Sequence, residues 1–448
     1  METKVGLNGS LGEHLRPRKR NMYRLPWSMN DNPIGWLEIT DRCNIYCKGC
    51  YRQQLVGHFP LEQIKDDILF LKEWRNCDNI SIAGGEPLVH PQILEILEFI
   101  RAQGMKPLVL TNGVRLNNNK PFLEELKAAG VFGFTFHIDS AQRRPGWFGK
   151  SELELCALRQ QYAEMIAEVG GLFVSFGCTT YYSNLHEIPL LVKWANDNAD
   201  IVHGLVFITY RGAPETDDIV FTVGDKKVEA QAELSYGYAD AEEIDITSRD
   251  VYKVIQDHYS HYDTAVYLGG TQRHDSIKWL IGLQVGTKGE MYGSVGSKAV
   301  EAVEALYHFF AGRYLAYMYP NRLPKLAFLA GAFDKGMRKV QANFWRAVLR
   351  DPRKLFAPIY VQSIGIVQAP DILPDGRTDM CDSCPDMVVW DGKLVHSCRL
   401  DEWRIYGQYV TPQMQAEIEA SGGEVFTERS ESDIDEDERL HMPVLGDD

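Results

Sequence analysis

The chain has 448 residues, nine cysteines and a formal net charge of −15. Its 45% hydrophobic and 24% charged content is ordinary for a soluble globular protein of about two to three domains. The negative balance argues against nucleic acid as a partner. No apolar run approaches the roughly 18 residues that cross a bilayer, and the charged run 14–20 lacks the apolar core of a signal peptide. We therefore expect a cytoplasmic protein, in which clustered thiols bind metal rather than form disulfides.

From Trp36 onward, short apolar runs alternate with amphipathic helical patterns. The predicted strands cover residues 36–40, 79–83, 107–111, 132–138, 172–178 and 201–208. Helices are expected between them, one of which begins at the capping box of Ser151 and Glu154. Six such units with short connections predict an α/β fold, a partial (β/α)6 TIM-like barrel over residues 34–214.

Other parts of the chain do not follow this pattern. We expect an irregular N-terminal arm over 1–33, and a mainly helical insertion over 215–370 that shapes the substrate region. A small cysteine-rich segment is expected over 371–410, and an acidic, disordered tail over 411–448. Within the insertion, residues 313–354 carry ten lysines and arginines against two aspartates, with many aromatic and aliphatic residues.

Three cysteines, Cys43, Cys47 and Cys50, follow the first predicted strand. They are too close together for a disulfide framework. Cysteine thiolates usually bind iron–sulfur clusters, which normally take four ligands, so three would leave one iron open for chemistry. The alternatives are a zinc site completed by His58, or an electron-carrying cluster whose next available cysteine is Cys77.

This Cys-x3-Cys-x2-Cys spacing resembles the signature of the radical SAM superfamily. The resemblance implies a [4Fe–4S] cluster whose open iron binds S-adenosylmethionine (SAM) and a flavodoxin- or ferredoxin-type electron donor. It also implies cleavage of SAM to a 5′-deoxyadenosyl radical that removes hydrogen from a substrate. The sequence departs from the family at Gly49, where relatives often carry an aromatic residue that packs on adenine. Tyr51 or another residue then supplies that contact, or it is absent.

Gly84, Gly85 and Glu86 begin a Gly-Gly-Glu-Pro stretch after the second predicted strand. It resembles the family motif that cradles the SAM amino group. Glycines allow backbone carbonyls to approach closely, and a carboxylate can meet an ammonium. The alternative is an ordinary turn before a helix.

Two further strand ends carry polar residues. Asn112 resembles part of a family turn near the methionine carboxylate, with a simple β-turn as the alternative. His137 and Asp139 stand where many relatives have a Ser-x-Asp that contacts ribose, although His137 could be a core histidine. Ligands of such sheets gather at the C-terminal ends of strands, where all these residues are predicted to lie.

Cys178 is the candidate catalytic residue, because it ends the fifth predicted strand and faces either the barrel interior or the helix layer. The alternative is a small buried side chain, which is common for free cysteine. Cys77 and Cys156 are predicted to be structural.

A second group contains Cys381, Cys384 and Cys398, with His396 as a possible fourth ligand. The pair Cys-x2-Cys brings two thiolates to one metal, and a hairpin at Asp391-Gly392 could return the third. The group resembles a shortened form of the SPASM and twitch modules of radical SAM enzymes, which implies a second iron–sulfur cluster. A Cys3His zinc site and a metal-free hairpin are the alternatives.

These observations predict a radical SAM enzyme. The basic, aromatic segment 313–354 favours a lipid, isoprenoid or other small amphipathic substrate, with peripheral contact at the inner membrane face. A peptide maturase is the second interpretation, for which the short segment 1–33 offers little room for a leader-binding domain. An interpretation of another class is a non-catalytic iron–sulfur or zinc protein.

Overall fold

The computed structural model describes residues 21–52, 57–210, 213–214, 219–224, 226–228, 237–238, 246–273, 276–373 and 377–414. Most of the predicted arm 1–33, nearly all of the acidic tail 411–448 and much of segment 215–245 lie outside these ranges. Every helix in the described part of the chain is too short or too polar to span a membrane.

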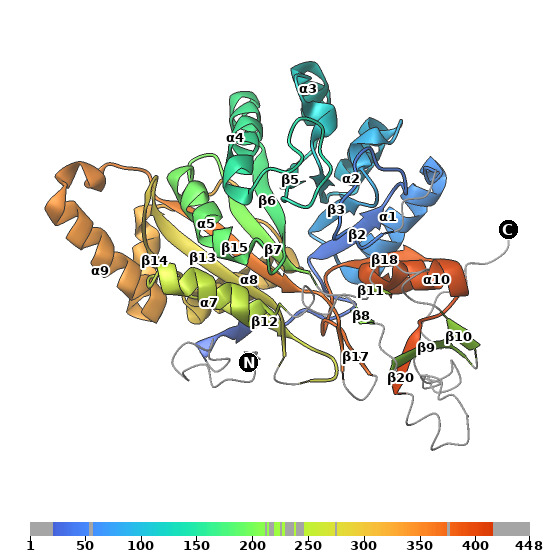
Figure 1. The fold of residues 1–448 in the computed structure, drawn as a ribbon. Coiled ribbons are helices and arrows are strands. Elements are labelled where there is room, and N and C mark those ends of the chain that lie inside the picture. Colours follow the sequence, from blue (N-terminus) through green and yellow to red (C-terminus); the bar gives the residue numbers. More distant parts are fainter. Residues whose placement is uncertain are drawn as a thin grey trace.

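Six parallel strands form one half of the main sheet (Figure 1). They lie in chain order, each beside the one before, which confirms the predicted succession of βα units. Their parallel register brings all six C-terminal ends to one edge of the sheet. The strands are β2 (Ile34–Glu38), β3 (Asn79–Ala83), β4 (Lys106–Thr111), β5 (Gly133–His137), β6 (Phe173–Thr180) and β7 (Gly204–Thr209).

A helix links each of these strands to the next and covers the outer face of the sheet (Figure 1). The helices are α1 (Leu61–Arg75), α2 (Ile93–Ala102), α3 (Lys120–Ala128), α4 (Glu152–Val169) and α5 (Ile188–Asp197). Helix α1 buries Ile64, Ile68 and Leu71, which recur at the spacing of one helical face. Helix α4 begins at the predicted capping box of Ser151 and Glu154.

The sheet does not close into a complete barrel. Strand β7 pairs with β15 (Tyr360–Gln368) instead of β2, and β15 continues the parallel direction. Beyond it lie the antiparallel β13 (Ile277–Thr287), then β12 (Val266–Gly269) and β1 (Tyr23–Arg24). Strand β14 (Glu290–Ser294) also pairs with β13. The curved sheet therefore stays open on one side.

The segment predicted as a mainly helical insertion is more mixed than expected. It contains α7 (Ser248–His258), α8 (Ser297–Ala311) and α9 (Lys335–Arg350). It also contains β12, β13, β14 and β15, which the sequence pattern did not predict and which extend the main sheet. These strands are stabilised by pairing partners distant in the chain, such as Leu283 with Ser363, so local periodicity is a weak guide to them.

The C-terminal cysteine segment folds around a hairpin. Strands β18 (Met387–Trp390) and β19 (Lys393–His396) join through Asp391 and Gly392, which have φ values of 49° and 72°. Two positive φ angles are typical of a tight hairpin turn, as the Asp-Gly sequence predicted. Helix α10 (Leu400–Tyr406) follows, and β20 (Thr411–Met414) then pairs with β9 (Ile219–Val223).

Candidate functional site

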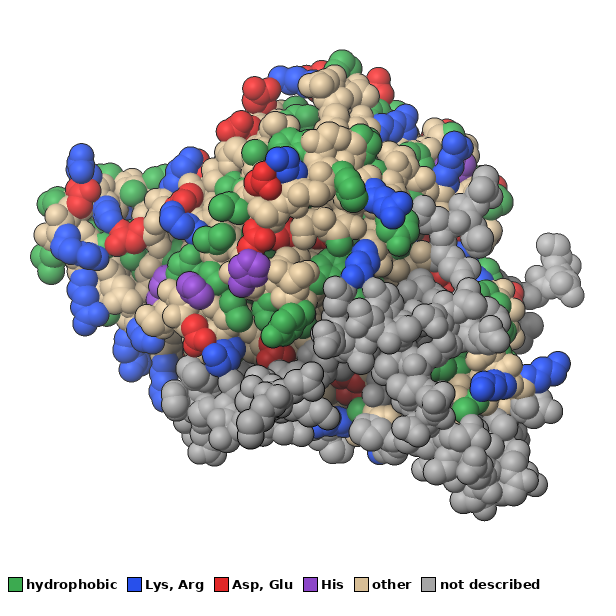
Figure 2. Space-filling model, in the orientation of Figure 1, with side chains coloured by type: hydrophobic (Ala, Val, Ile, Leu, Met, Phe, Trp, Pro, Cys, Tyr) green, Lys and Arg blue, Asp and Glu red, His purple; other side chains and the backbone are tan. Residues whose placement is uncertain are grey.

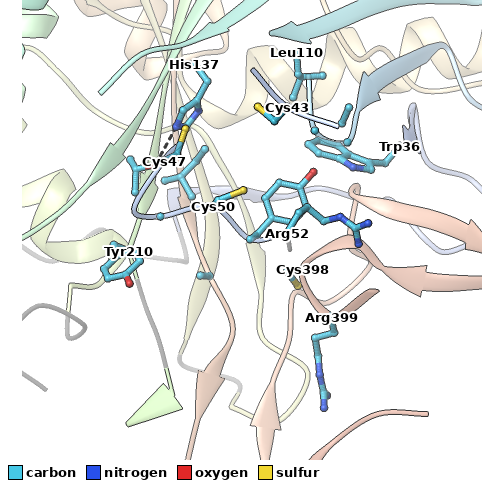
Figure 3. A pocket seen from close by; sticks show the side chains of 18 of the residues that line it. Trp36, Cys43, Cys47, Cys50, Arg52, Leu110, His137, Tyr210, Cys398 and Arg399 are labelled. Atoms are coloured by element: carbon cyan, nitrogen blue, oxygen red, sulfur yellow. Dashed lines mark hydrogen bonds between the residues drawn. The ribbon is translucent and has the colours of Figure 1, made fainter. Parts of the chain in front are cut away.

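A cavity of about 280 Å³ lies at the C-terminal ends of the parallel strands (Figure 3). Cys43, Cys47 and Cys50 line one part of it, and Figure 3 shows their sulfur atoms around a common open region. The cavity wall also contains the predicted residues of the other strand ends, except Asp139 and Cys178. The fold therefore brings the motifs together at one site.

Backbone contacts on both sides hold the cysteine loop. At its start, Thr40 forms a β-bridge with His58, and the Thr40 hydroxyl lies 2.9 Å from Nδ1 of His58. Further along, Cys47 bridges Gln142, in the loop after β5. His58 is therefore part of the support of the loop and not of the cavity wall, which weakens its role as a zinc ligand.

The two glycines of the Gly-Gly-Glu-Pro stretch pack directly on this loop. Gly84 has a φ of 118°, and a side chain there would collide with the Thr40 carbonyl. A side chain on Gly85 would collide with the Arg42 carbonyl, while its N–H donates to Thr40 O at 2.7 Å. The glycines are thus required by the close approach of two backbone segments.

Glu86 binds protein donors. Its Oε1 accepts from the Leu88 N–H at 3.0 Å and the Thr111 hydroxyl at 2.5 Å, and its Oε2 accepts from the Asn112 N–H at 2.7 Å. Burial raises the pKa of Glu86, although these hydrogen bonds oppose the shift. The carboxylate therefore ties the end of β3 to the end of β4.

Asn112 joins the second strand end to the cysteine loop. Its side-chain N–H2 donates to Asn44 Oδ1 at 2.7 Å and lies 3.9 Å from the Cys43 sulfur. Arg144, which sequence analysis missed, is buried and donates to the carbonyls of Asn112 and His137. No local motif marks Arg144, because its partners lie on different strand ends.

His137 lines the cavity, and Asp139 lies behind it. The Asp139 Oδ2 is 3.1 Å and the Thr179 hydroxyl 2.9 Å from Nε2 of His137. Asp139 also accepts from the Ala141 N–H, so it is fixed in place. The pair thus differs from the predicted two ligand contacts: His137 faces the cavity and Asp139 orients it.

Gly49 has no side chain, and the space beside it is filled by Tyr181 and Tyr210, which follow β6 and β7. A side chain at Gly49 would lie 2.6 Å from Tyr181 Oη and 3.3 Å from the ring of Tyr210. The rings of Tyr181 and Tyr210 are 4.9 Å apart. Tyr210 and Tyr51 line the cavity, so both offer the aromatic surface that the loop lacks at Gly49.

The three loop thiols are free and half-buried. Burial raises the pKa of Cys43, and burial with the nearby Asp139 raises that of Cys47. Burial also raises the pKa of Cys50 to about 11. Without a cation the thiols would stay protonated, whereas bound iron favours thiolates, so the donor set suits a metal group.

No three or more His, Cys, Asp or Glu side chains within the described ranges converge as they would around one ion. A tetrahedral zinc site requires such convergence. In a cubane cluster each cysteine binds its own iron, so the sulfur atoms stand apart. The loop cysteines are therefore not arranged around a single ion.

Residues 37–191 match the family model described as the Radical SAM superfamily. The chain contains a radical SAM domain. Such a domain implies a [4Fe–4S] cluster and SAM. The matched range includes the three loop cysteines and the motif residues at the ends of β3, β4 and β5.

Curated relatives align with only part of the chain. The 7,8-dihydro-6-hydroxymethylpterin dimethyltransferase of Methanocaldococcus jannaschii is 26% identical over 225 residues, 49% of this chain and 44% of that protein. The antilisterial bacteriocin subtilosin biosynthesis protein AlbA of Bacillus subtilis is 29% identical over 172 residues, 36% of each chain. The GTP 3′,8-cyclase of Peptoclostridium acidaminophilum is 33% identical over 112 residues, 23% of this chain and 33% of that protein. The chain thus spans less than half the length of these three relatives.

Solved structures with partial likeness include SuiB of Streptococcus suis, with a TM-score of 0.37 and 14% identity over 52% of this chain and 47% of SuiB. Coproporphyrinogen III oxidase (HemN) of Escherichia coli, titled a radical SAM enzyme, has a TM-score of 0.29 and 12% identity, covering 54% of this chain and 59% of that chain.

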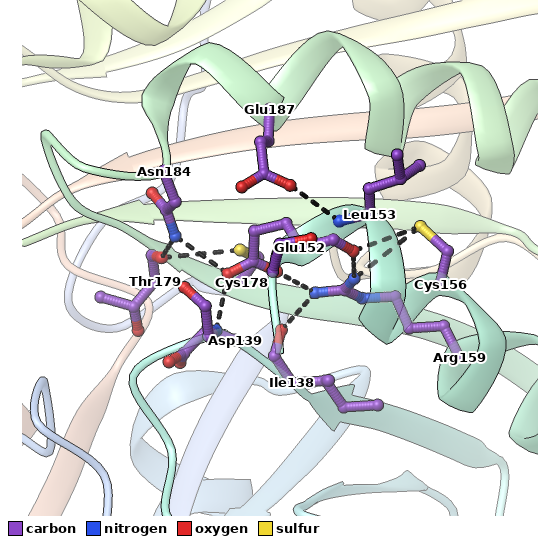
Figure 4. Close-up of polar contacts among 12 residues, drawn as sticks. Ile138, Asp139, Glu152, Leu153, Cys156, Arg159, Cys178, Thr179, Asn184 and Glu187 are labelled. Carbon is purple, nitrogen blue, oxygen red and sulfur yellow. Dashed lines mark hydrogen bonds and ion pairs between the residues drawn. The ribbon is translucent and has the colours of Figure 1, made fainter. Parts of the chain in front are cut away.

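Cys178 lies outside the cavity of the radical SAM domain. It is 2% exposed and packs in the core, with its thiol 3.5 Å from Thr179 O. Burial raises its pKa well above the usual value, as does the nearby Glu152, which is paired with Arg159 (Figure 4). Side chains alternate along a strand, so Thr179 faces the cavity and Cys178 faces the helix layer. The prediction of a catalytic Cys178 is therefore not supported by its position.

Figure 4 shows the buried network around Glu152, which sequence analysis also missed. Glu152 accepts from the Ser140 N–H at 2.7 Å and from the Asn184 side chain at 3.0 Å. Its other oxygen pairs with Arg159 at 2.5 Å. The network anchors the loops that follow β5 and β6 beneath the site.

The second cysteine group is brought together beside the radical SAM domain. Cys381 and Cys384 pack with Met387 and are 9% and 5% exposed. A hydrogen bond with Cys381, together with burial, raises the pKa of Cys384, and burial with the nearby Cys381 raises that of Cys398. Cys398 also lines the main cavity (Figure 3). The three thiols therefore lie near one another at the edge of the cavity, Cys381 and Cys384 buried and Cys398 half-buried.

His396 has a separate partner. Its Nδ1 lies 3.2 Å from the Tyr409 hydroxyl, and burial with the nearby Arg399 lowers its pKa to about 4. The neutral imidazole leaves Nε2 as the atom for a fourth ligand. That role stays a prediction.

A buried guanidinium, Arg52, connects the two cysteine groups. It pairs with Glu38 at 2.9 Å, Asp41 at 3.0 Å and Asp401 at 3.0 Å. Asp401 follows Cys398 on α10, and Asp41 precedes Cys43, so the network joins both segments. Sequence analysis missed Arg52, because its partners come from two parts of the chain that are far apart in sequence.

Proposed function

We propose that this protein is a radical SAM enzyme that removes hydrogen from a small, largely apolar or amphipathic molecule, with a lipid or isoprenoid as the favoured class. The observation that carries this proposal is the composition of the cavity wall. The cysteine loop lines part of the cavity, and the wall also includes Ile208, Phe221, Pro370 and Pro412. An apolar wall supports an apolar substrate and keeps water from a reactive intermediate.

Within this proposal, Cys43, Cys47 and Cys50 hold the [4Fe–4S] cluster and leave one iron for SAM. When bound, the cluster and SAM supply an electron and a 5′-deoxyadenosyl radical that abstracts hydrogen. The carbonyls of Gly84 and Gly85 are the acceptors we assign to the SAM ammonium. Glu86 contributes indirectly, because its carboxylate holds Asn112 in place.

His137 is assigned to a polar group of SAM. Asp139 and Thr179 fix its ring through Nε2, so the orientation of the imidazole is set before a ligand binds. Aromatic contact with the adenine is assigned to Tyr210 or Tyr51, which line the cavity. These assignments rest on position at the cavity wall.

We also propose that Cys381, Cys384 and Cys398 bind a second iron–sulfur cluster, and that a flavodoxin- or ferredoxin-type protein supplies the electron. Residues 34–214 then form the catalytic core and residues 371–410 the second cluster segment. The support is the burial of Cys381 and Cys384 and the position of the half-buried Cys398 on the wall of the same cavity. Zinc is the competing metal, and metal analysis of the anaerobically purified protein distinguishes the two.

The test is anaerobic reconstitution with iron and sulfide, followed by dithionite and SAM, with 5′-deoxyadenosine measured by chromatography. The proposal predicts the product in the wild-type protein and its loss in Cys43→Ala. Cys156→Ala is the matched control, because its thiol lies on α4, outside the cavity. Absence of product from a wild-type protein with a full cluster would contradict the enzyme proposal.

A peptide-modifying activity is the second candidate. Its support is the 29% identity with the bacteriocin biosynthesis protein AlbA. Mass spectrometry of extracts incubated with the active protein separates the candidates, since a modified peptide and a modified lipid partition into different phases.

A further inference from the structure

The basic lobe, residues 322–356, projects at the end of the molecule opposite β9 and β20 (Figure 1). It consists of the 3₁₀ helices η7 (Lys325–Ala332) and η8 (Pro352–Leu355) with α9 between them. It contributes no residue to the cavity wall. The proposed catalytic site therefore does not account for its surface.

One face of the lobe is fully used in packing. Helix α9 buries Met337, Val340, Phe344 and Ala347 in a core cluster with residues of β13 and β14. Phe344 also packs against Phe328 of η7, with ring centroids 5.0 Å apart. The fold of the lobe is thus stabilised by inward side chains, and outward residues are available for another purpose.

The outward side chains include large apolar groups. Leu326 and Leu329, one turn apart on η7, are 72% and 68% exposed. Trp345 and Leu349, one turn apart on α9, are 48% and 84% exposed, and Phe356 is 84% exposed. The elements are in direct contact, because Arg338 of α9 donates to the carbonyl of Gly331 in η7. A monomer gains nothing by exposing this much apolar surface in one lobe.

Positive charge surrounds these apolar residues. The lobe contains nine lysines and arginines against two aspartates. Asp334 is buried as the cap of α9, and Asp351 pairs with Arg353. Arg350 and Lys354 pair with Glu290 of β14, whereas in the described part of the chain Lys335 and Lys339 have no carboxylate within salt-bridge distance. Figure 2 shows blue lysine and arginine side chains among green hydrophobic ones at this end.

We propose that the basic lobe docks on an anionic lipid bilayer. Leu326, Leu329 and Leu349 enter the headgroup region, and the surrounding cations contact lipid phosphates. Charge argues for this occupant over a second copy docked lobe to lobe, because two cationic lobes repel each other, whereas anionic lipid attracts the lysines and arginines of the lobe.

Another exposed apolar face provides an internal control. Helix α8 exposes Phe309 and Phe310 by 79% and 81%, more than the ring of Trp345. Its own charged residues are Lys298, Glu301 and Glu304, so it lacks the cationic surround. If apolar exposure alone caused binding, this face would bind as well.

The experiment is flotation of the purified full chain with vesicles of phosphatidylcholine, with or without phosphatidylglycerol. It needs neither cluster nor SAM, so it can succeed or fail independently of the proposed function. The wild-type protein should float with anionic vesicles only, and less so at high salt. The triple variant Lys335→Glu/Lys339→Glu/Arg346→Glu should bind at least about tenfold more weakly, given the usual contribution of each cation.

A second variant, Leu349→Ser/Phe356→Ser, should also lose binding, while Phe309→Ser/Phe310→Ser should retain it. Far-UV circular dichroism and thermal melting establish that each variant folds. Equal flotation with neutral vesicles, no flotation of the wild type, or equal loss in the α8 variant would overturn the proposal. So would a wild-type dimer, seen by light scattering, that both lobe variants dissociate.

Discussion

Residues 34–210 and residues 246–414 both contribute to the wall of one cavity but are built by different means. In the first part, each strand pairs with the next in chain order. In the second, β15 pairs with β7 and β13, and β12 pairs with β1 from the N-terminal end. The first part places its three cysteines half-buried on an open cavity, whereas Cys381 and Cys384 of the second are packed among apolar residues.

This difference suggests a division of roles. An open set of ligands suits binding of a reactant, and a closed set suits structure or electron transfer. Because the βα units repeat, the C-terminal ends of successive strands lie at the same edge of the sheet, where each can carry a motif. Residues 246–414 contribute apolar residues to the cavity wall and the buried pair Cys381 and Cys384. Variants that change one part and leave the other intact test this division of roles.

The largest expected effect distinguishes the two cysteine groups. Cys43→Ala should lower formation of 5′-deoxyadenosine at least about 100-fold, because a ligand of the reactive cluster is lost. Cys381→Ala should lose iron from the second group and keep measurable SAM cleavage. Iron content, electron paramagnetic resonance and product yield check this, and equal loss in both variants would contradict separate roles.

Removal of Arg52 should weaken the connection between the two parts, in which the pair of Arg404 with Asp41 remains. Arg52→Met leaves three carboxylates of a buried network without their shared cation, which should lower the free energy of unfolding by about 3–5 kcal/mol. Chemical denaturation measures the change. Lys193→Met is the control, because its exposed pair with Asp197 should be worth less than about 1 kcal/mol. Similar losses in the two variants would show that the network does not join the parts.

The two parts should also respond to pH in opposite directions. Burial lowers the pKa of His203, before β7, to about 4, so its neutral form is favoured in the folded state. Stability present above the unfolded pKa of about 6.5 should be lost as pH falls toward 4, by up to about 3 kcal/mol.

Glu304 on α8 has the reverse sign. Burial raises its pKa to about 7, so stability present below the unfolded value of about 4.5 should be lost as pH rises through 7. The free energy of unfolding of His203→Gln should lack the loss of stability at low pH. That of Glu304→Gln should lack the loss of stability as pH rises. Parallel pH profiles of both variants and the wild type would contradict the assignment.

A smaller effect concerns the space beside Gly49. Gly49→Ala should destabilise the cysteine loop by about 1–3 kcal/mol, because its methyl group would lie 2.6 Å from Tyr181 Oη. Gly49→Ala/Tyr181→Phe removes that hydroxyl and should recover part of the loss. Thermal melts of the single and double variants measure the coupling, and strictly additive effects would show that the tyrosine does not fill this space.

Much of the barrel could be predicted because its signals are local. The strand 79–83 and the start of α4 at Ser151 agree with the pattern, since apolar runs and capping boxes act within a few residues. Each motif directly follows a predicted strand in the sequence, so its position at a strand end could also be predicted. Local chemistry was therefore sufficient for the fold of the first part and for the cysteine, glycine and asparagine positions of the site.

Contacts between distant residues decided the rest. Whether Cys178 or Thr179 faces the cavity depends on strand register, and the partners of Glu86 come from the next strand end. Arg52, Arg144 and Tyr181 carry no motif, because each acts on segments far from it in the chain. The strands after residue 260 could not be predicted for the same reason. Burial and pairing with distant strands stabilise them more than local propensity does.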